Sequence, residues 1–263
     1  MDNIEELNLQ ILPITLLSKF LGQLNNDLEK QFNKLKDSEL DVANFSFYTS
    51  VSAVFSSKIE GEDIELDSYI KHKRFGAHFL PDYTRKIDDL YDTYIYAQQN
   101  KLNIKNVAKA HTLLTKHILQ KAQQGRLRKG NMFVVTKDGK IEYVAVAPEK
   151  VEEELNKLHE DIAKLINCEL TFNETFFFAS LIHLVFVKIH PFEDGNGRTG
   201  RLLEKWFLSE KLGEKAWFIP SERNYYEQHQ TYYHNLRKLG IEYEELDYSK
   251  ALPFVQMLAS SIN

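Results

Sequence analysis

The sequence predicts a mainly α-helical protein with one small β-hairpin. Apolar residues recur three and four positions apart over most of the 263 residues, which is the spacing of amphipathic helices. Six prolines and eleven glycines are too few for the many tight turns of an all-β fold. One pair of β-branched runs, Met132–Thr136 and Ile141–Val146, flanks Asp138-Gly139. An Asp-Gly pair between such runs is typical of a hairpin turn.

Amphipathic patterns predict the helices of the N-terminal half in order. Ile14–Leu35 places its leucines and phenylalanines on one stripe, and Phe45–Ile59 follows. The second helix should end at Glu60-Gly61, because glycine is common just past a helix end. Asp63–Phe79 is predicted to be helical in part, since a basic run interrupts its pattern. Two further helices are expected at Thr84–Gln99 and Ile104–Ala122.

The C-terminal half is predicted to be helical after the hairpin. Pro148 suits a first helical turn, and Val151–Ile166 continues it. A nearly continuous apolar helix, ending at Ile189, should be capped by Thr171 or Asn173 and lie at the centre of the molecule. The remaining predicted helices are Arg198–Leu212, Ser221–Leu239 and Tyr248–Leu258.

Several histidines and tyrosines have ordinary structural interpretations. His111 and His117 are six residues apart, which is the wrong spacing for one helix face, so no metal pair is expected. His183 lies two turns before His190 and is expected to make a buried hydrogen bond. The tyrosines of the Ser221–Leu239 segment either line a pocket for a purine or fill the core: Tyr225, Tyr226, Tyr232 and Tyr233.

Composition narrows the class of protein. The formal net charge of −5 argues against nucleic acid as an obligatory partner. Cys168 is the only cysteine, so no intramolecular disulfide forms and a reducing compartment is expected. The acidic N-terminus lacks the layout of a signal peptide, and the apolar run Phe176–Val187 is expected to be too short to cross a bilayer. These features predict a cytoplasmic protein without a membrane partner.

The stretch from His190 to Arg201 carries the chemistry. It reads His-Pro-Phe-Glu-Asp-Gly-Asn-Gly-Arg-Thr-Gly-Arg, between two predicted helices. Glycines let successive backbone N–H groups turn toward one point, and the next helix would add its positive N-terminal end. Two arginines could bind phosphate oxygens. Asp194 fits such a site if Mg²⁺ bridges it to the phosphates, and His190 is a suitable proton acceptor near neutral pH. The stretch indicates metal-assisted transfer from a nucleotide.

This stretch resembles the signature of the Fic (Fido) family, His-x-Phe-x-Asp/Glu-Gly-Asn-Gly-Arg-x-x-Arg. The resemblance covers roughly residues 105–240 and implies a Fic-type helical bundle whose β-hairpin flap overhangs the loop. It divides the chain into an N-terminal helical region (1–103), a catalytic core (104–240) and a C-terminal tail (241–263).

Most members of this family transfer AMP from ATP to a hydroxyl group of a target protein and release pyrophosphate. The resemblance therefore implies ATP as substrate, Mg²⁺ as cofactor, and His190 as the base for a Tyr, Ser or Thr hydroxyl. Phe192 would anchor the loop and Asp194 would hold Mg²⁺. Phosphates would be bound by Gly195, Asn196, Gly197, Arg198 and Arg201, and the target by flap residues Val134, Val135 and Thr136. Doc-type relatives that phosphorylate carry a lysine near the third loop glycine, whereas Gly195 and Gly197 are kept here.

Ser56-Ser57-Lys58-Ile59-Glu60-Gly61 resembles the family's autoinhibitory motif, Ser/Thr-x-x-x-Glu-Gly/Asn. It lies at the end of a predicted helix that precedes the core, as in members that carry the inhibitor within their own chain. The resemblance implies that Glu60 reaches Arg201 and that Ser56 fixes the helix.

Three functions remain open. The first is AMP transfer from ATP (AMPylation), including self-modification, with inhibition by Glu60. The second is hydrolytic removal of AMP from a modified protein, or transfer of another nucleotide. The third is a non-catalytic nucleotide-binding module, against which His190 and Asp194 argue, because binding alone requires no base. The identity of the target and the oligomeric state stay open, and a homodimer is one possibility.

Overall fold

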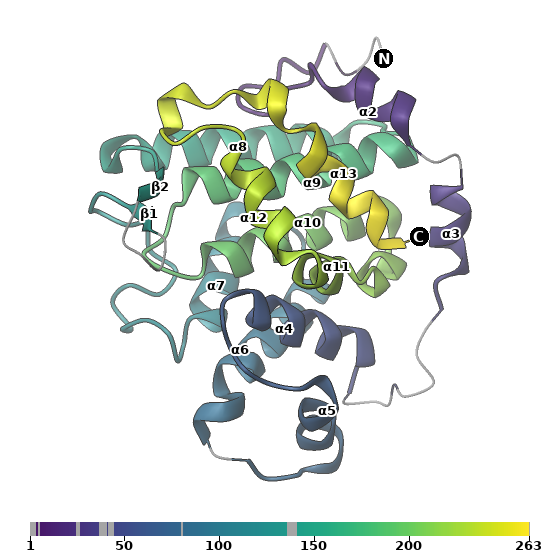
Figure 1. The fold of residues 1–263 in the computed structure, drawn as a ribbon, viewed down its shortest axis with the longest axis vertical. Helices are drawn as coiled ribbons and strands as arrows, with labels where there is room; N and C mark the ends of the chain where they lie inside the picture. Colours follow the sequence, from purple (N-terminus) through teal and green to yellow (C-terminus); the bar gives the residue numbers. More distant parts are fainter. Residues whose placement is uncertain are drawn as a thin grey trace.

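The protein is mainly helical with one two-stranded antiparallel hairpin, as predicted (Figure 1). The computed structural model describes residues 4, 6–24, 27–36, 41, 45–79, 81–135 and 141–262. The buried apolar residues of these segments form a continuous core that runs from the N-terminal helices to the C-terminal one.

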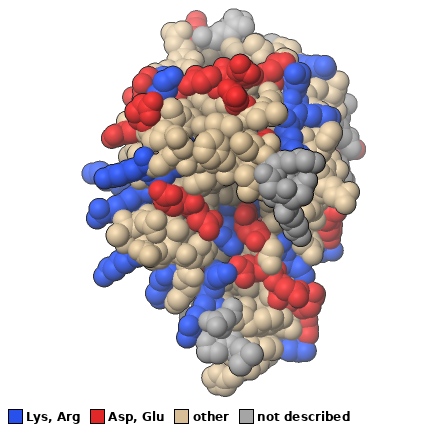
Figure 2. Space-filling model, turned by 60° about the vertical axis from the view of Figure 1, so that its left-hand side comes forward, with Lys and Arg blue, Asp and Glu red and all other residues tan. Residues whose placement is uncertain are grey.

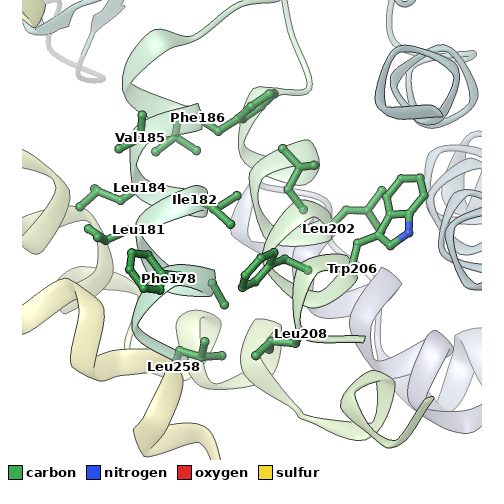
Figure 3. Close-up of a cluster of buried hydrophobic side chains, with 14 of the residues drawn as sticks. Phe178, Leu181, Ile182, Leu184, Val185, Phe186, Leu202, Trp206, Leu208 and Leu258 are labelled. Carbon is green, nitrogen blue, oxygen red and sulfur yellow. The ribbon is translucent and has the colours of Figure 1, made fainter. Parts of the chain in front are cut away.

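Helix α9 (Phe172–Ile189) is the centre of this core. Thr171 caps it through a capping box with Glu174, which satisfies two of the N–H groups that a helix start leaves free. Helix α10 (Asn196–Leu212) packs along it, with Ile182 and Phe186 pointing toward α10, whereas Trp206 points to the other side of α10, away from α9 (Figure 3). All these side chains are less than 2% exposed. The two helices therefore fix both ends of the loop between them.

The expectation that the apolar segment is too short to cross a bilayer was wrong. Helix α9 has 18 residues and is long and apolar enough to cross a membrane by length and composition, and 83% of it is buried inside the fold. Its apolar residues are accounted for by packing, because the core helix of a globular domain has the same composition.

The predicted helix Ile14–Leu35 is instead two short helices. Helix α2 (Leu17–Gln23) ends at Leu24, which is extended, and α3 (Leu28–Lys34) starts again after Asp27. Each helix contributes an aromatic ring to α9, because Phe20 lies 5.3 Å from Phe177 and Phe32 lies 5.2 Å from Phe172 between ring centroids. The break lets both short helices follow the surface of α9, and Figure 1 shows α2 at the upper right and α3 at the right edge.

Helices α4, α6 and α7 pack beside α10, and α5 packs against α4. Helix α4 (Phe47–Ile59) starts at the cap Ser46 and ends where expected. Only Leu66–Phe75 (α5) of the predicted Asp63–Phe79 is helical, ending at the left-handed Gly76. Helix α6 (Pro81–Gln98) is followed by α7 (Ile104–Leu114), which is shorter than predicted, because the chain turns at Thr115. The Thr115 hydroxyl donates to the carbonyl of His111, 2.6 Å away, within that last turn.

The predicted hairpin is present and is irregular. Strand β1 (Phe133–Val135) pairs with β2 (Ile141–Val144), with a register shift between Val134 and Val135. The Asp138-Gly139 turn and Thr136 lie outside the described residues. On its other side β2 contacts the C-terminal segment, where the Val144 amide donates to the carbonyl of Ile241. Among the described strands, β1 is therefore the free edge.

Helix α8 (Val151–Asn167) follows a 3₁₀ turn, η1 (Pro148–Lys150), as the proline suggested. The predicted helix Ser221–Leu239 is broken at Gln228 into α11 (Ser221–Glu227) and α12 (His229–Arg237). The last predicted helix starts later than expected, at α13 (Leu252–Ala259), and Tyr248–Lys250 forms a 3₁₀ turn (η4). Short 3₁₀ turns complete the chain at η2 (Glu214–Phe218), η3 (Tyr243–Glu245) and η5 (Ser260–Ile262).

Candidate active site

The loop between α9 and α10 is tight. His190 ends α9 in the left-handed region with φ 53°, and Gly195 precedes α10 with φ 79°. A Cβ at Gly195 would also lie 2.8 Å from the Thr115 side chain. Both the positive φ and this close approach therefore require glycine at position 195. Helix α10 starts at Asn196 rather than near Arg198 as predicted. Its first amide groups, which lack intrahelical acceptors, therefore belong to the glycine-rich loop itself.

Two side chains fix the shape of the loop. The Asn196 side chain accepts from the Phe192 amide (2.9 Å) and donates to the Phe192 carbonyl (2.8 Å). The Phe192 ring is buried and stacks on His111, with 3.6 Å between ring centroids. Asn196, which was expected to cradle phosphate, therefore holds the loop backbone in this structure.

His111 supports the loop and does not form a metal site with His117. Its Nε2 contacts the carbonyl of Asp194 at 2.9 Å, and its Nδ1 contacts the Gly125 amide at 2.9 Å. A carbonyl accepts and an amide donates, so the ring is neutral with its proton on Nε2. Burial lowers the pKa of His111 to about 4, which agrees with that assignment. His117 pairs with Asp89 instead.

His190 is arranged as a proton acceptor. Its Nδ1 lies 3.2 Å from the carbonyl of Val187. Because a carbonyl can only accept, Nδ1 carries the proton and Nε2 keeps its lone pair. Burial lowers the pKa of His190, and the nearby Arg128 adds to this effect, against the opposing hydrogen bond to Val187. The ring is therefore in its basic, neutral form at neutral pH.

Arg128 ties the loop to the hairpin. It is 3% exposed, and its Nε donates to the carbonyl of His190 at 2.7 Å. The other guanidinium nitrogens donate to the carbonyls of Gly130 and Val146, which lie just before and just after the hairpin. One buried cation thus holds the flap in place over the end of α9.

Arg201 is fully buried and bound by the end of α4. Its Nη2 lies 2.6 Å from Glu60 Oε1 and 3.0 Å from the Ser56 carbonyl, and its Nε lies 2.9 Å from the Ser56 hydroxyl. Burial alone would raise the pKa of Glu60, but Arg201 and Arg198 outweigh it and lower that pKa. Glu60 is therefore an ionised carboxylate on an arginine of the loop.

Arg198 is held less firmly by a second carboxylate on the same turn. Glu62 Oε1 lies 3.6 Å from Arg198 Nη2 and 2.7 Å from Lys86 of α6. The Nε of Arg198 is buried without a hydrogen-bond partner in the part of the chain that the structure describes. Gly197 makes room for this arrangement, because a Cβ there would lie 2.3 Å from Glu60 Oε1.

A chain of buried hydrogen bonds continues from Arg201 into the core. Arg201 Nη1 contacts the Tyr232 hydroxyl at 3.4 Å, Tyr232 contacts His183 at 3.1 Å, and His183 contacts Glu204 at 2.9 Å. His183 therefore makes the buried hydrogen bonds that the sequence suggested. Tyr225 also donates to Glu204 and is part of the core.

Asp194 has the chemistry of a partial magnesium site. It is exposed, and one carboxylate oxygen accepts from the Gly195 amide. Within the described ranges no group of three or more histidine, cysteine or acidic side chains could hold a metal ion. Mg²⁺ is commonly bound by one or two carboxylates together with substrate phosphates, so a single carboxylate at a phosphate site fits it.

A cavity of about 170 Å³ lies between the loop and the flap. Its lining includes residues of the loop and its neighbours, of α12 and of the hairpin: Glu60, Lys188, His190, Gly197, Arg201, Tyr232, Tyr233, Leu236, Val134 and Tyr143. Tyr232 and Tyr233 thus line a pocket, whereas Tyr225 fills the core. Figure 2 shows this face of the molecule, where acidic and basic side chains alternate around a hollow.

A wider groove continues outward from the cavity. It is lined by the end of α4, by Val134 and Val135 of β1, and by the start of α12. Of the predicted flap residues, Val134 lines both spaces and Val135 is exposed. Val134 therefore lies between the groove and the cavity that His190 lines.

The residues of the predicted loop meet at this site, and Ser56 and Glu60 come to it from far away in the sequence. Sequence reasoning missed Arg128, Glu62 and Lys188, which line or support the site, and it gave His111 an ordinary packing role without connecting that residue to the loop. A buried arginine or histidine gives no periodic signal in a sequence. Only the apolar surroundings of Lys188, at the end of a hydrophobic helix, could have indicated an unusual lysine.

Comparisons with known proteins find similarity to Fic proteins. Residues 101–208 match the model of the Fic/DOC family. The chain is 29% identical over 178 residues to the protein adenylyltransferase Fic of Drosophila virilis, and 30% identical over 178 residues to that of Drosophila melanogaster. Each match covers 65% of this chain and 31% of the relative. The chain thus spans about a third of the length of these curated relatives.

Solved structures share the fold. A Fic family protein from Desulfovibrio desulfuricans G20 has a TM-score of 0.67 at 20% identity and covers 100% of this chain and 72% of its own. A Fic domain containing signaling protein from Bacteroides thetaiotaomicron VPI-5482 has a TM-score of 0.67 at 18% identity, over 99% of this chain and 92% of that one. The predicted helical bundle with a hairpin is confirmed by these likenesses.

Proposed function

We propose that the protein transfers AMP from ATP to a hydroxyl group of a target protein, because residues 101–208 match the Fic/DOC family model and the chain is distantly similar to protein adenylyltransferases. The observation that carries the proposal is the contact of His190 Nδ1 with the Val187 carbonyl, 3.2 Å away. A histidine whose Nδ1 donates to a backbone carbonyl presents its basic Nε2, and it does so beside two arginines and a helix N-terminus suited to phosphate. Binding alone requires no such base.

His190 acts on the acceptor. Its Nε2 takes the proton from a Tyr, Ser or Thr hydroxyl of the target, and the hydroxyl oxygen attacks the α-phosphorus. The bond from that phosphorus to the bridging oxygen of the β-phosphate breaks, and pyrophosphate leaves with the electron pair. A base placed this way typically contributes about 10²–10⁴-fold to the rate. Most of the remaining acceleration comes from placing groups and stabilising charge.

The loop holds the phosphates. Arg198 and Arg201 supply guanidinium groups for the outer phosphates, and the first turn of α10 supplies amide groups. Asp194 would hold Mg²⁺ with the phosphates, and the bound ion would neutralise their charge. The nucleoside would occupy the cavity against Tyr232, Tyr233 and Leu236, since aromatic rings are good platforms for a base.

Glu60 restrains this reaction in the proposal. It occupies Arg201 at 2.6 Å and puts a negative charge where a terminal phosphate must come. Ser56 supports the arrangement because its hydroxyl and carbonyl both bind Arg201. ATP would then bind weakly or in a pose unfit for in-line attack.

One experiment separates transfer from the alternatives. The protein and its Glu60→Gly variant are incubated with α-labelled ATP, Mg²⁺ and a cell lysate, and separately with a target that already carries AMP. Labelled protein bands with ATP support transfer, including self-modification if the band is the protein itself. Release of AMP from the modified target without labelling supports hydrolysis. A protein that binds ATP and does neither would be a binding module.

A further inference from the structure

Lys188 is a buried lysine that the proposed mechanism does not use. It lies on the last turn of α9, two residues before His190, and is 4% exposed. It lines the same cavity as His190, Gly197 and Arg201. Burying an ammonium group costs free energy unless a partner compensates it, so its position beside the site calls for a partner.

The charges of the cavity wall leave this lysine unmatched. Among the described residues that line the cavity, Arg201 pairs with Glu60, and Arg237 pairs with Glu142. No described acceptor or carboxylate lies within hydrogen-bond or ion-pair distance of the Lys188 ammonium. The wall therefore carries one positive charge that an anionic ligand would balance.

The hairpin holds the ammonium group in place. Lys188 Nζ lies 3.9 Å from the ring centroid of Tyr143, a cation–π contact, and the Tyr143 hydroxyl donates to the Lys188 carbonyl at 2.6 Å. A cation–π contact replaces only part of the hydration of an ammonium group. Burial accordingly lowers the pKa of Lys188 to about 8. At neutral pH the group is still mostly charged and is able to bind an anion.

We propose that Lys188 binds an anionic oxygen of the α-phosphate of the nucleotide, and so positions the phosphoryl group that is transferred. The inference rests on the proposed function, because it requires a nucleotide in this cavity. The α-phosphate is the anionic group that must come next to His190, and Lys188 lies at the same end of α9. The arginines of the loop serve the outer phosphates, so Lys188 is the side-chain cation of the described cavity wall that is left for the α-phosphate, beside the amide groups of α10.

The test compares adenosine, which has no phosphate, with AMP, which has only the α-phosphate. Binding is measured by isothermal titration calorimetry at pH 7 for the wild type and for Lys188→Met, which keeps an apolar stem for Tyr143. Lys150→Met is the matched control, because Lys150 pairs with Glu244 on the surface, where both side chains are more than half exposed. Thermal unfolding of all three proteins shows that they are folded.

We expect Lys188→Met to lose about tenfold or more in AMP affinity, the scale of one charge-assisted contact, with adenosine affinity unchanged. In the wild type the preference for AMP over adenosine should fall as pH rises above about 8, because Lys188 loses its charge there. In Lys188→Met that preference should not change over the same range.

Equal AMP affinity in the wild type and Lys188→Met would overturn the inference and leave the proposed function standing. Equal losses for AMP and adenosine would also overturn it, because they would place Lys188 on the nucleoside. If neither ligand, nor ATP, binds the wild type or Glu60→Gly, the proposed function fails first and the inference fails with it.

Discussion

Replacing Glu60 by glycine should release the site. The substitution removes the carboxylate 2.6 Å from Arg201 and leaves the two contacts of Arg201 with Ser56 intact. Residue 60 has φ −86° and ψ 8°, which any residue adopts, so no backbone strain arises. Arg201 faces the cavity, so water or phosphate can reach the guanidinium group that the variant frees.

The size of the effect follows from the ion pair. Two unit charges about 4 Å apart interact by about 4 kcal/mol at an effective dielectric constant of about 20. The Glu60 side chain is 27% exposed, and solvent screening reduces this value. Close charge pairs in interfaces couple by about 1.5 kcal/mol or more. Since about 1.4 kcal/mol corresponds to tenfold in an equilibrium constant, ATP affinity and AMP transfer should each rise at least about tenfold.

The assay measures incorporation of labelled AMP by the wild type and Glu60→Gly side by side, with ATP affinity and the midpoint of thermal unfolding measured on the same samples. Glu62→Gln is the matched comparison, because its carboxylate lies on the same turn at a longer 3.6 Å from Arg198 and should matter less. Arg201→Ala should be inactive alone and together with Glu60→Gly. Equal incorporation by the wild type and a folded Glu60→Gly would refute the reasoning and make Ser56–Gly61 an ordinary helix end.

Four other outcomes are expected. His190→Ala should lose AMP transfer by about 10²–10⁴-fold while ATP binding persists in calorimetry, and a parallel loss of both would assign His190 another role. Asp194→Ala should lose turnover that depends on Mg²⁺, and a magnesium titration that matches the wild type would remove Asp194 as a ligand. Because burial lowers the pKa of His190, kcat/KM should fall with decreasing pH only below about 6.5, the ordinary pKa of histidine. A fall in kcat/KM that begins at or above that pH would contradict a buried neutral base. If the free edge of β1 pairs with the target, Val135→Pro should reduce target modification and leave ATP affinity unchanged. Val144→Pro removes the hydrogen bond to Ile241 and should also lower the midpoint of thermal unfolding. Unchanged target modification by both variants would exclude strand pairing.

Much of the fold could be predicted because its signals are local. The apolar run of α9, the Thr171 cap and the β-branched runs around Asp138-Gly139 each lie within one element. The breaks at Leu24 and Gln228 could not be predicted, because the apolar spacing continues across them. At Leu24 packing decides, since both short N-terminal helices place a ring against α9.

The residues of the site also fall into those that local sequence could identify and those that it could not. The stretch from His190 to Arg201 identifies its own residues, and the resemblance of Ser56–Gly61 to a motif singled out Glu60. Arg128 and His111 lie 62 and 83 residues from the loop groups that they bind, and no spacing rule connects positions so far apart. Lys188 needed the structure for another reason, because a lysine at a helix end is usually exposed.

The central claim, nucleotidyl transfer, is tested most directly by the position of the label that a target retains. Glu60→Gly is incubated with Mg²⁺ and a cell lysate, once with ATP labelled at the α-phosphate and once with ATP labelled at the γ-phosphate. Modified proteins are then identified by mass spectrometry. We expect that, above the labelling of a lysate without the protein, only the α-label is incorporated, as AMP on a Tyr, Ser or Thr side chain, and that Glu60→Gly combined with His190→Ala adds none. Incorporation of the γ-label alone would show phosphoryl transfer, and incorporation of neither label would contradict the account.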